Sequence, residues 1–351
     1  MNRLGTDASM RGSSSGWHTR HPKGSSLLSL CLVILLSLGL FGCGQPGTNR
    51  DSDASGPTRL ASPVKLRMGT GSTTGTYYPY GEALAKVLMD DIEGLDIEVL
   101  CTEGAQSNLY DIAANTLDLA FVQNDVADYA TRGSSLFLEV VDGFSAMAAL
   151  YPEACQIVAR PDINTVVDLK GRNVSIGEIG SGSSFNAIQI LDAYDMSVMS
   201  IKVYNLGFEE SVDAFRAGTI DAFFCVAGIP TVAISELAAS DDITLLSVDE
   251  AHAAKLIEKH PFYNMIEVKG GTYRGVDSEV PTVAVKAMII VSNKLSSDLV
   301  YMLTKALFEN RAEIASNHVM GAYLDEADAI KGITVPFHPG AERYFHEIGL
   351  M

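Results

Sequence analysis

Basic residues are scarce in this sequence. Its 351 residues include 25 Lys and Arg against 43 Asp and Glu, which gives a formal net charge of −18. A chain this acidic repels the phosphates of nucleic acids and the headgroups of anionic lipids. The composition therefore argues against nucleic acid or an anionic membrane surface as a partner. An anion could be bound only in a local pocket whose donors override the overall field.

Cysteine is also rare, with five residues in the whole chain. Cys101, Cys155 and Cys225 are widely spaced, and they form no CxxC pair with each other or zinc-ligand spacing with a histidine. One disulfide would leave an odd thiol. We instead expect all three to be small buried side chains in strands, and we predict no metal site.

The common catalytic and nucleotide-binding motifs are missing. HExxH, GxSxG and a recognisable Cys–His arrangement are absent. The loop that begins at Gly69 and Gly71 has Thr74 where the dinucleotide fingerprint requires its third glycine, and no P-loop is present. We therefore predict no catalytic residue, no cofactor and no enzymatic activity.

The N-terminus carries an export signal. Four basic residues precede the apolar run LLSLCLVILLSLGLFG (27–42), which is short for a membrane span and typical of a signal-peptide core. The run ends at Cys43 in a sequence that resembles a bacterial lipobox. We predict a lipoprotein signal peptide over 1–43, with Cys43 lipidated. The alternative is an uncleaved single-span anchor.

A flexible tether follows the signal. Residues 44–63 (GQPGTNRDSDASGPTRLASP) are rich in Gly, Ser, Asp and Pro and contain almost no large apolar side chain. Together with a lipid at Cys43, this segment would hold a periplasmic globular region close to the membrane.

From Val64 onward, short apolar runs alternate with amphipathic stretches, a pattern typical of parallel sheets flanked by helices. The expected strands are 65–69, 97–101, 119–123, 144–150, 156–160, 173–177, 201–204, 220–225, 243–247 and 283–291. The expected helices are 79–90, 105–114, 184–194, 208–217 and 296–317.

The alternating region repeats itself once. LRMGTGSTTG (66–75) is echoed by VSIGEIGSGSS (174–184), and ANTLDLAF (114–121) is echoed by AGTIDAFF (217–224). Two landmarks in the same order, about one hundred residues apart, indicate two similar α/β lobes. We assign 64–157 plus 288–351 to lobe 1 and 158–287 to lobe 2, with crossing strands near 156–160 and 283–291 as the hinge.

In such lobes a ligand lies at the carboxyl ends of the strands. Both echoed loops are rich in glycine and hydroxyl side chains and open a helix, where free amides and the helix dipole favour a carboxylate. The strand end at 121–125 adds amide side chains, and the apolar segment 225–230 adds a wall. The candidate ligand-binding residues are Ser72, Gly75, Thr76, Tyr77, Gln123, Asn124, Ser181, Gly182, Ser183, Ser184 and Gly228.

Neither loop contains a basic residue, so capture would depend on amides and hydroxyls. Arg160, Lys269 and Arg274 could reach a cleft from elsewhere in the chain, although surface positions are the simpler interpretation.

Several of these motifs resemble one known family. GTGSTTGTYYPYG (69–81), TEGAQSNL (102–109), LDLAFVQNDVA (117–127), DLKGRNVSIGEIGSGSS (168–184), GTIDAFFCVAGIP (218–230) and PFHPGAERYFHEIG (336–349) are similar to the TAXI family. These are the extracytoplasmic solute receptors of a class of TRAP transporters. The resemblance runs from Val64 to the C-terminus in family order. It implies a class-II-like periplasmic-binding fold.

The resemblance also implies a function. We expect a receptor that binds a small carboxylate, such as glutamate, a dicarboxylate or another organic acid, and delivers it to the membrane subunits of an ion-coupled TRAP permease. We expect it to act as a monomer. The alternatives are a receptor for an ABC importer of a sulfonate, nitrate or a vitamin precursor, a periplasmic enzyme on the same fold, and a sensory partner of a membrane protein.

Overall fold

The computed structural model describes residues 58–135 and 137–351. The predicted signal peptide, Cys43 and residues 44–57 of the predicted tether lie outside them. Residues 58–63, which we assigned to the tether, instead form the start of strand β1 (Thr58–Gly69). Within the described ranges, no helix combines the length and apolarity that a membrane crossing requires.

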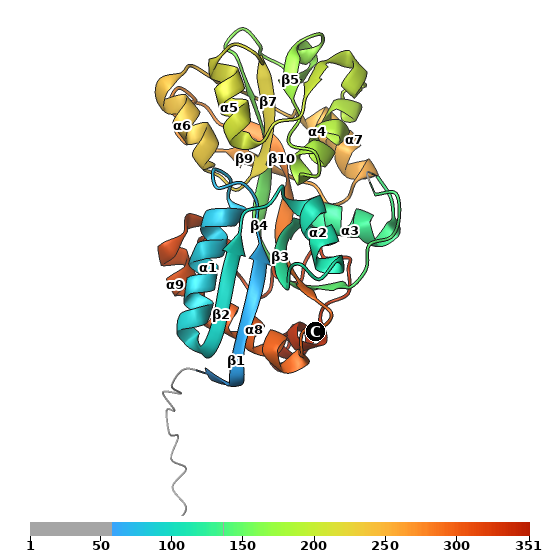
Figure 1. Ribbon diagram of the computed structural model, residues 1–351. Coiled ribbons are helices and arrows are strands. Elements are labelled where there is room, and N and C mark those ends of the chain that lie inside the picture. Colours follow the sequence, from blue (N-terminus) through green and yellow to red (C-terminus); the bar gives the residue numbers. More distant parts are fainter. Residues whose placement is uncertain (1–57, 136) are drawn as a thin grey trace, which may run out of the picture. The chain divides into compact units, whose positions relative to one another are not determined.

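The described residues form two lobes on one mixed sheet (Figure 1). The first lobe contains β1, α1 (Tyr77–Asp91), β2 (Ile92–Leu100), α2 (Ala105–Ala113), β3 (Leu119–Gln123), α3 (Asn124–Arg132), α8 (Ser297–Glu309), α9 (Arg311–Asn317) and α10 (Pro339–Glu347). The second contains β5 (Asn173–Ser175), α4 (Gly182–Ala193), β6 (Lys202–Tyr204), α5 (Phe208–Arg216), β7 (Ala222–Ala227), α6 (Val232–Ser240), β8 (Thr244–Leu246), α7 (Glu250–Lys259) and β9 (Asn264–Val268). Strands β4 (Phe144–Ala159) and β10 (Val280–Ser292) run through both lobes.

The strand order explains how the lobes are joined. The sheet runs β2-β1-β3-β10-β4-β7-β5-β6, with β8 paired to β4 and β9 to β10. Parallel pairs link β1 to β2 and β3 in the first lobe, and β5 to β6 and β7 in the second. Strands β4 and β10 are antiparallel to each other. Strand β10 is also antiparallel to β3, and β4 is also antiparallel to β7. The expected two-lobed α/β fold is therefore confirmed.

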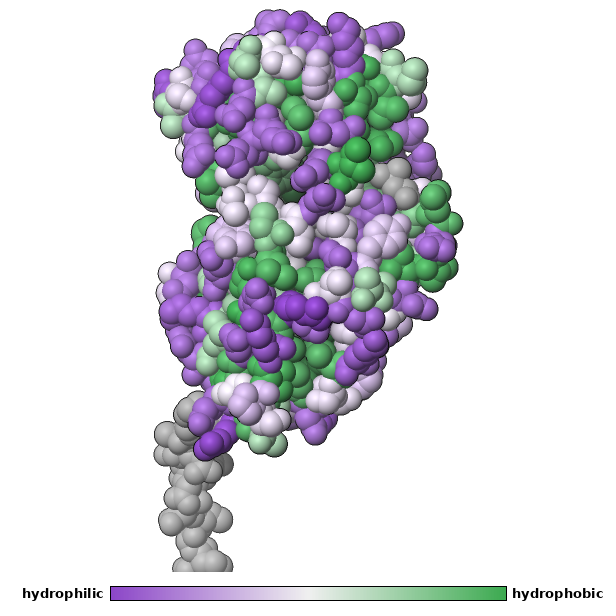
Figure 2. All heavy atoms as spheres, viewed as in Figure 1, coloured by the Kyte–Doolittle hydropathy of each residue, from purple (hydrophilic) through white to green (hydrophobic). Residues whose placement is uncertain are grey.

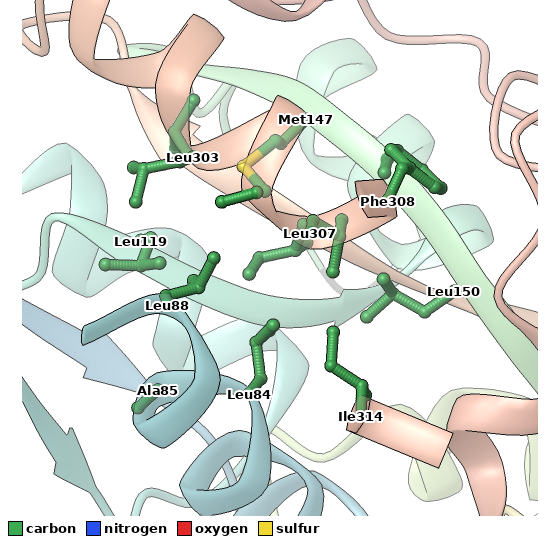
Figure 3. Close-up of a cluster of buried hydrophobic side chains, with 14 of the residues drawn as sticks. Leu84, Ala85, Leu88, Leu119, Met147, Leu150, Leu303, Leu307, Phe308 and Ile314 are labelled. Atoms are coloured by element: carbon green, nitrogen blue, oxygen red, sulfur yellow. The ribbon is translucent and has the colours of Figure 1, made fainter. Parts of the chain in front are cut away.

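The central strands β3, β4, β7 and β10 are buried on both faces, which is why they are largely apolar. In β3, Leu119 and Phe121 face one core, and Ala120 and Val122 face the other. Figure 3 shows the first of these cores, where leucines of α1 and α8 meet Leu119, Met147 and Leu150 of the sheet. The second lobe has its own core on each sheet face.

Two expected elements differ from the structure in their continuity. The strands expected at 144–150 and 156–160 are one strand, β4. Pro152 lies close to a bulge of β4 at Leu150, and a missing backbone donor is tolerated near such a bulge. The helix expected over 296–317 is divided into α8 and α9. Asn310 ends α8, and its side-chain amide donates to the Ala306 carbonyl (3.0 Å).

No bounds were predicted for the helices α3, α6, α7 and α10 or for the strand β9. The sequence of α3, NDVADYATR, is polar, yet Asn124 to Ala130 are all buried. The expectation for the cysteines was partly wrong: Cys155 and Cys225 are buried in strands, whereas Cys101 is exposed just after β2.

The long strands β4 and β10 provide the passages between the lobes. Residues 144–154 of β4 pair with β10, and residues 154–159 pair with β7 of the second lobe. The lobe boundaries that we assigned, after 157 and after 287, lie inside these two strands.

Candidate ligand-binding site

The candidate site is a cavity between the lobes, at the carboxyl ends of the parallel strands. It encloses about 530 Å³ of empty space, part of it open to solvent. Figure 2 shows polar residues of both lobes bordering the waist of the molecule at this level. The lining residues are Gly71, Ser72, Gly75, Thr76, Tyr77, Glu103, Gly104, Ala105, Gln123, Glu153, Glu178, Ser181, Gly182, Ser183, Gly207, Phe208, Val226 and Ala227.

The first glycine-rich loop connects β1 to α1. Its turn is closed by a hydrogen bond from the Gly75 amide to the Ser72 carbonyl (3.1 Å). A side chain at Gly75 would begin 3.2 Å from the ring of Phe208, which belongs to the second lobe. Glycine at this position therefore lets the loop approach α5 closely.

The second glycine-rich loop connects β5 to α4. Gly177 and Gly180 adopt positive φ angles of 100° and 86°, which favour glycine. The Ser181 hydroxyl accepts a hydrogen bond from the Ser184 amide and so caps α4. It also donates to the Glu178 carbonyl (2.7 Å), which closes the loop.

Four helices begin at the cavity. The N-cap residues Thr76 of α1, Gly104 of α2, Ser181 of α4 and Gly207 of α5 all line it. First-turn amides have no carbonyl one turn earlier to bind, and aligned peptide dipoles place partial positive charge at each of these ends. The cavity therefore has a positive electrostatic contribution that comes from backbone rather than from basic side chains.

Two hydroxyl groups are oriented by backbone amides. Thr76 accepts a hydrogen bond from the Gly228 amide (3.0 Å), and Ser183 accepts one from the Val226 amide (3.1 Å). A hydroxyl that accepts in this way keeps its own proton for another partner. Because both side chains line the cavity, both can donate to a ligand oxygen.

A buried carboxyl group forms one wall of the cavity. Glu153 of β4 is 2 % exposed and accepts a hydrogen bond from the Tyr77 hydroxyl (2.9 Å). Burial raises the pKa of Glu153 to about 8, although hydrogen bonds from Tyr77 and Gln123 act in the opposite direction. The side-chain oxygen Oε1 of Gln123 is buried beside it and has no hydrogen-bond partner in the described part of the chain.

Two further carboxyl groups stand at the cavity mouth. Glu103 and Glu178 line both the cavity and a wider groove outside it, which adds Asp111, Glu209 and Glu210. Burial raises the pKa of Glu178, and the nearby charges of Glu103 and Glu210 raise it further. Among the described residues, no Lys, Arg or His lines either the cavity or the groove.

The three basic residues singled out from the sequence lie elsewhere. The Arg160 guanidinium is 4.4 Å from the centre of the Phe215 ring. Arg274 donates to the Ala239 carbonyl (2.7 Å), and Lys269 pairs with Glu279 (3.3 Å).

The structure brings most of the predicted site residues together. Ser72, Gly75, Thr76, Tyr77, Gln123, Ser181, Gly182 and Ser183 line the cavity, whereas Asn124, Ser184 and Gly228 do not. Asn124 instead donates to the Gly332 carbonyl (2.8 Å) and accepts from the Lys286 amide (3.0 Å). The Ser184 hydroxyl donates to the Ser181 carbonyl (2.8 Å).

Sequence reasoning missed the carboxyl groups. Glu153 carried a usable signal, because it is the one charged residue inside the apolar run 144–159. Glu103 and Glu178 carried none, since each stands in a loop where a solvated carboxylate is ordinary.

The lobes touch directly, so the structure is a closed form. The Gln106 amide donates to the Gly180 carbonyl (2.9 Å), and the Ala233 amide donates to the Thr74 carbonyl (3.1 Å). Gly182 lies against the Gln123 side chain so closely that an added Cβ would be 1.8 Å from its oxygen.

A buried polar network also joins α3 to α4. Asn186 donates to the Asp125 carboxyl group (3.0 Å), and Gln189 donates to the Tyr129 hydroxyl (3.0 Å). The Tyr263 hydroxyl donates to the Gln189 oxygen (2.6 Å). Burial raises the pKa of Asp125 to about 7.

The chain is similar to one protein family and to several solved structures. The model of the NMT1-like family matches residues 68–349. Among solved structures, the alkanesulfonate-binding protein SsuA from Xanthomonas axonopodis pv. citri bound to MOPS is 17% identical, with 82% of this chain and 85% of that chain covered and a TM-score of 0.48.

Two further solved structures have similar values. An L-cystine ABC transporter protein from Listeria monocytogenes is 14% identical, with 74% and 98% covered and a TM-score of 0.47. The GluR0 ligand-binding core from Nostoc punctiforme in complex with L-glutamate is 14% identical, with 72% and 96% covered and a TM-score of 0.45.

Proposed function

The chain belongs to the NMT1-like family, and we propose that it is an extracytoplasmic solute receptor that closes around a small carboxylate ligand. The observation that carries this proposal is the meeting of four helix N-termini at one cavity between two lobes. Such ends bind anions without a basic side chain.

The donors available in the cavity suit a carboxylate. First-turn amides at Tyr77 and Gly182 face it from opposite lobes, and the hydroxyls of Thr76 and Ser183 each retain a proton to donate. Hydrogen bonds to a charged group contribute about 1.5–3 kcal/mol each. Micromolar affinity corresponds to about 8 kcal/mol, so four such bonds together with apolar contacts to Phe208 and Val226 are sufficient.

We further propose that the receptor serves a TRAP transporter of the TAXI type. The support is the family-ordered series of motifs from Val64 to the C-terminus. In this proposal Cys43 carries a lipid, residues 44–57 tether the domain in the periplasm, and the closed surface delivers the ligand to the membrane subunits of the permease as a monomer. The protein itself binds and does not catalyse.

Calorimetric titration of the protein with amino acids, their deaminated acids and dicarboxylates tests the proposal. We expect at least one of these acids to bind with about micromolar affinity, and the double variant Ser72→Ala, Ser183→Ala to weaken it at least tenfold, the order of one charged hydrogen bond. Ser316→Ala, on the far helix α9, is the matched control. Binding of sulfonates or nitrate in preference to carboxylates would overturn the ligand class.

The transporter partner is tested separately. Co-purification of the lipid-anchored protein with a multispan permease supports the TRAP assignment. Co-purification with an ATPase subunit would support the alternative, a receptor for an ABC importer.

A further inference from the structure

The cavity contains one buried acceptor atom with no donor assigned to it, and it lies next to a buried carboxyl group. Gln123 is 2 % exposed and lines the cavity, and its Oε1 atom is buried without a hydrogen-bond partner in the described residues. Glu153, equally buried, accepts hydrogen bonds from the Tyr77 hydroxyl and from the Gln123 side chain. Buried acceptors are nearly always paired, so this wall of the cavity calls for a donor supplied by the ligand.

The carboxyl groups around the cavity favour a donor that carries a positive charge. Glu153 lies inside, Glu103 and Glu178 stand at the mouth, and no basic side chain of the described residues lines the same space. A second carboxylate on the ligand would be repelled by Glu103 and Glu178, and it would oppose ionisation of Glu153. A cationic donor is attracted by the two carboxylates at the mouth and favours ionisation of Glu153.

From these observations we propose that the ligand is a zwitterion, an α-amino acid whose ammonium group is bound by Glu153 and Gln123 while its carboxylate lies at the helix N-termini. We further infer that Glu103 and Glu178 select an uncharged or cationic side chain and disfavour an acidic one. This inference rests on the proposed receptor function and narrows its ligand from carboxylates in general to amino acids without an acidic side chain.

The geometry places the two recognition regions next to each other. Tyr77 belongs to the first turn of α1 and also donates to Glu153, so the amide end and the acceptor wall meet at one residue. Gly182 of α4 lies against the Gln123 side chain from the other lobe. A ligand held by both regions is therefore contacted by both lobes, which couples recognition to closure.

Binding of an ammonium group should release the proton of Glu153, and this release can be measured. The ionisable groups that face this carboxyl group are Tyr77 from α1, Asp125 from α3, Tyr151 and Cys155 from β4, and Cys225 from β7. None of them is a cation, and burial raises the pKa of Glu153 to about 8. An ammonium group beside it would favour the ionised form, so a bound amino acid displaces a proton near neutral pH.

Matched ligand pairs test the inference by calorimetry on the full chain. L-glutamine is compared with glutaramate, L-leucine with 4-methylpentanoate, and L-arginine with 5-guanidinopentanoate, each pair differing only by the ammonium group. We expect the amino acid of the best-binding pair to bind about 10- to 100-fold more tightly than its partner, the effect of one charged hydrogen-bonding group. We also expect L-glutamate to bind more weakly than L-glutamine.

Two variants and a control identify the residues that cause these ligand preferences. Glu153→Gln should remove most of the preference for the amino acid over its deaminated partner, and Glu178→Gln should reduce the preference for glutamine over glutamate. Glu258→Gln removes an exposed charge from α7 and should change neither. Titrations near pH 7 in phosphate and Tris should show release of about one proton per amino acid bound, and none in Glu153→Gln.

The outcomes separate the two proposals. If a deaminated acid or glutarate binds as tightly as the amino acid, or if no proton is released, the zwitterion inference is wrong and the carboxylate receptor stands. If none of these acids binds, both proposals are wrong.

Discussion

The two glycine-rich loops have similar sequences and each precedes a helix, but they differ in the partners of their hydroxyl groups. In the first lobe, the Thr76 hydroxyl accepts the Gly228 amide from the opposite lobe. In the second lobe, the Ser183 hydroxyl accepts the Val226 amide of its own lobe. One hydroxyl therefore participates in closure, and the other supports local structure.

The strand ends beside these loops also differ, in the polarity of the side chains that they place in the cavity. Strand β3 ends at Gln123, whose amide side chain lies in the cavity beside Glu153, whereas β7 ends at the apolar pair Val226 and Ala227. The first lobe thus contributes the polar side chains of the inner wall. At this strand end the second lobe contributes apolar surface, and its hydroxyl donor Ser183 comes from helix α4 instead.

The contact between the halves is most easily broken at Gly182. The change Gly182→Ala places a Cβ 1.8 Å from the Gln123 oxygen, so the lobes cannot close as observed. We expect ligand affinity to fall by about 100-fold or more, the effect of losing several hydrogen bonds at once, while each lobe remains folded. Titration together with circular dichroism checks this.

Ser316→Ala provides the control, because this residue is exposed on α9 and does not line the cavity. An unchanged affinity in Gly182→Ala would show that the closed contact is not used in binding.

Two variants of the cavity wall compare a polar residue of the first lobe with an apolar residue of the second. Tyr77→Phe removes the hydroxyl that donates to Glu153, and we expect a loss of about tenfold in affinity, as for a hydrogen bond to a charged group. Phe208→Leu, in the second lobe, keeps an apolar surface and should cost only about threefold. Titration of both variants with one ligand measures the difference. A larger effect at Phe208 would reverse the assignment of roles.

Removing the Thr76 or the Ser183 hydroxyl should have a smaller effect, and the two changes should affect different quantities. Thr76→Val and Ser183→Ala each remove the acceptor of one backbone amide, at a cost of about 1 kcal/mol. For Thr76→Val we expect weaker ligand binding with an unchanged Tm of the ligand-free protein, because the lost bond joins the lobes. Ser183→Ala should lower that Tm. Thermal unfolding with and without ligand separates them, and equal shifts in Tm would contradict the distinction.

The last expected effect concerns the dependence of stability on pH. Asp125 and Glu153 have pKa values raised by burial to about 7 and about 8. The folded protein therefore binds their protons more tightly than the unfolded chain, and this stabilisation is complete below about pH 4 and lost as the pH rises through about 8. Urea unfolding should show lower stability near pH 9 than near pH 5.

Asp125→Asn and Glu153→Gln should each reduce this pH dependence, and Glu258→Gln should leave it unchanged. Stability that rises over the same interval would show that other groups dominate the titration.

The sequence predicted the lobes and most of the cavity, because those features depend on local patterns. Strand–helix alternation and the repeated loops located Ser72, Thr76, Tyr77, Ser181 and Ser183 at one cavity. The misses depend on distant contacts. Asn124 resembles a ligand donor in the sequence, but its amide binds backbone groups of Gly332 and Lys286, more than 160 residues away. The acidic mouth arises only when the loops of Glu103 and Glu178 meet.

The passage of β4 and β10 through both lobes also sets the order in which the chain can fold. The core of the first lobe combines residues 66–151 with residues 287–345, so it stays incomplete until the last part of the chain is available for folding. The second lobe is contained in one continuous segment and needs no such delay. We expect its amides to gain protection first in pulsed hydrogen exchange during refolding. The opposite order would show that the first lobe forms without α8 and β10.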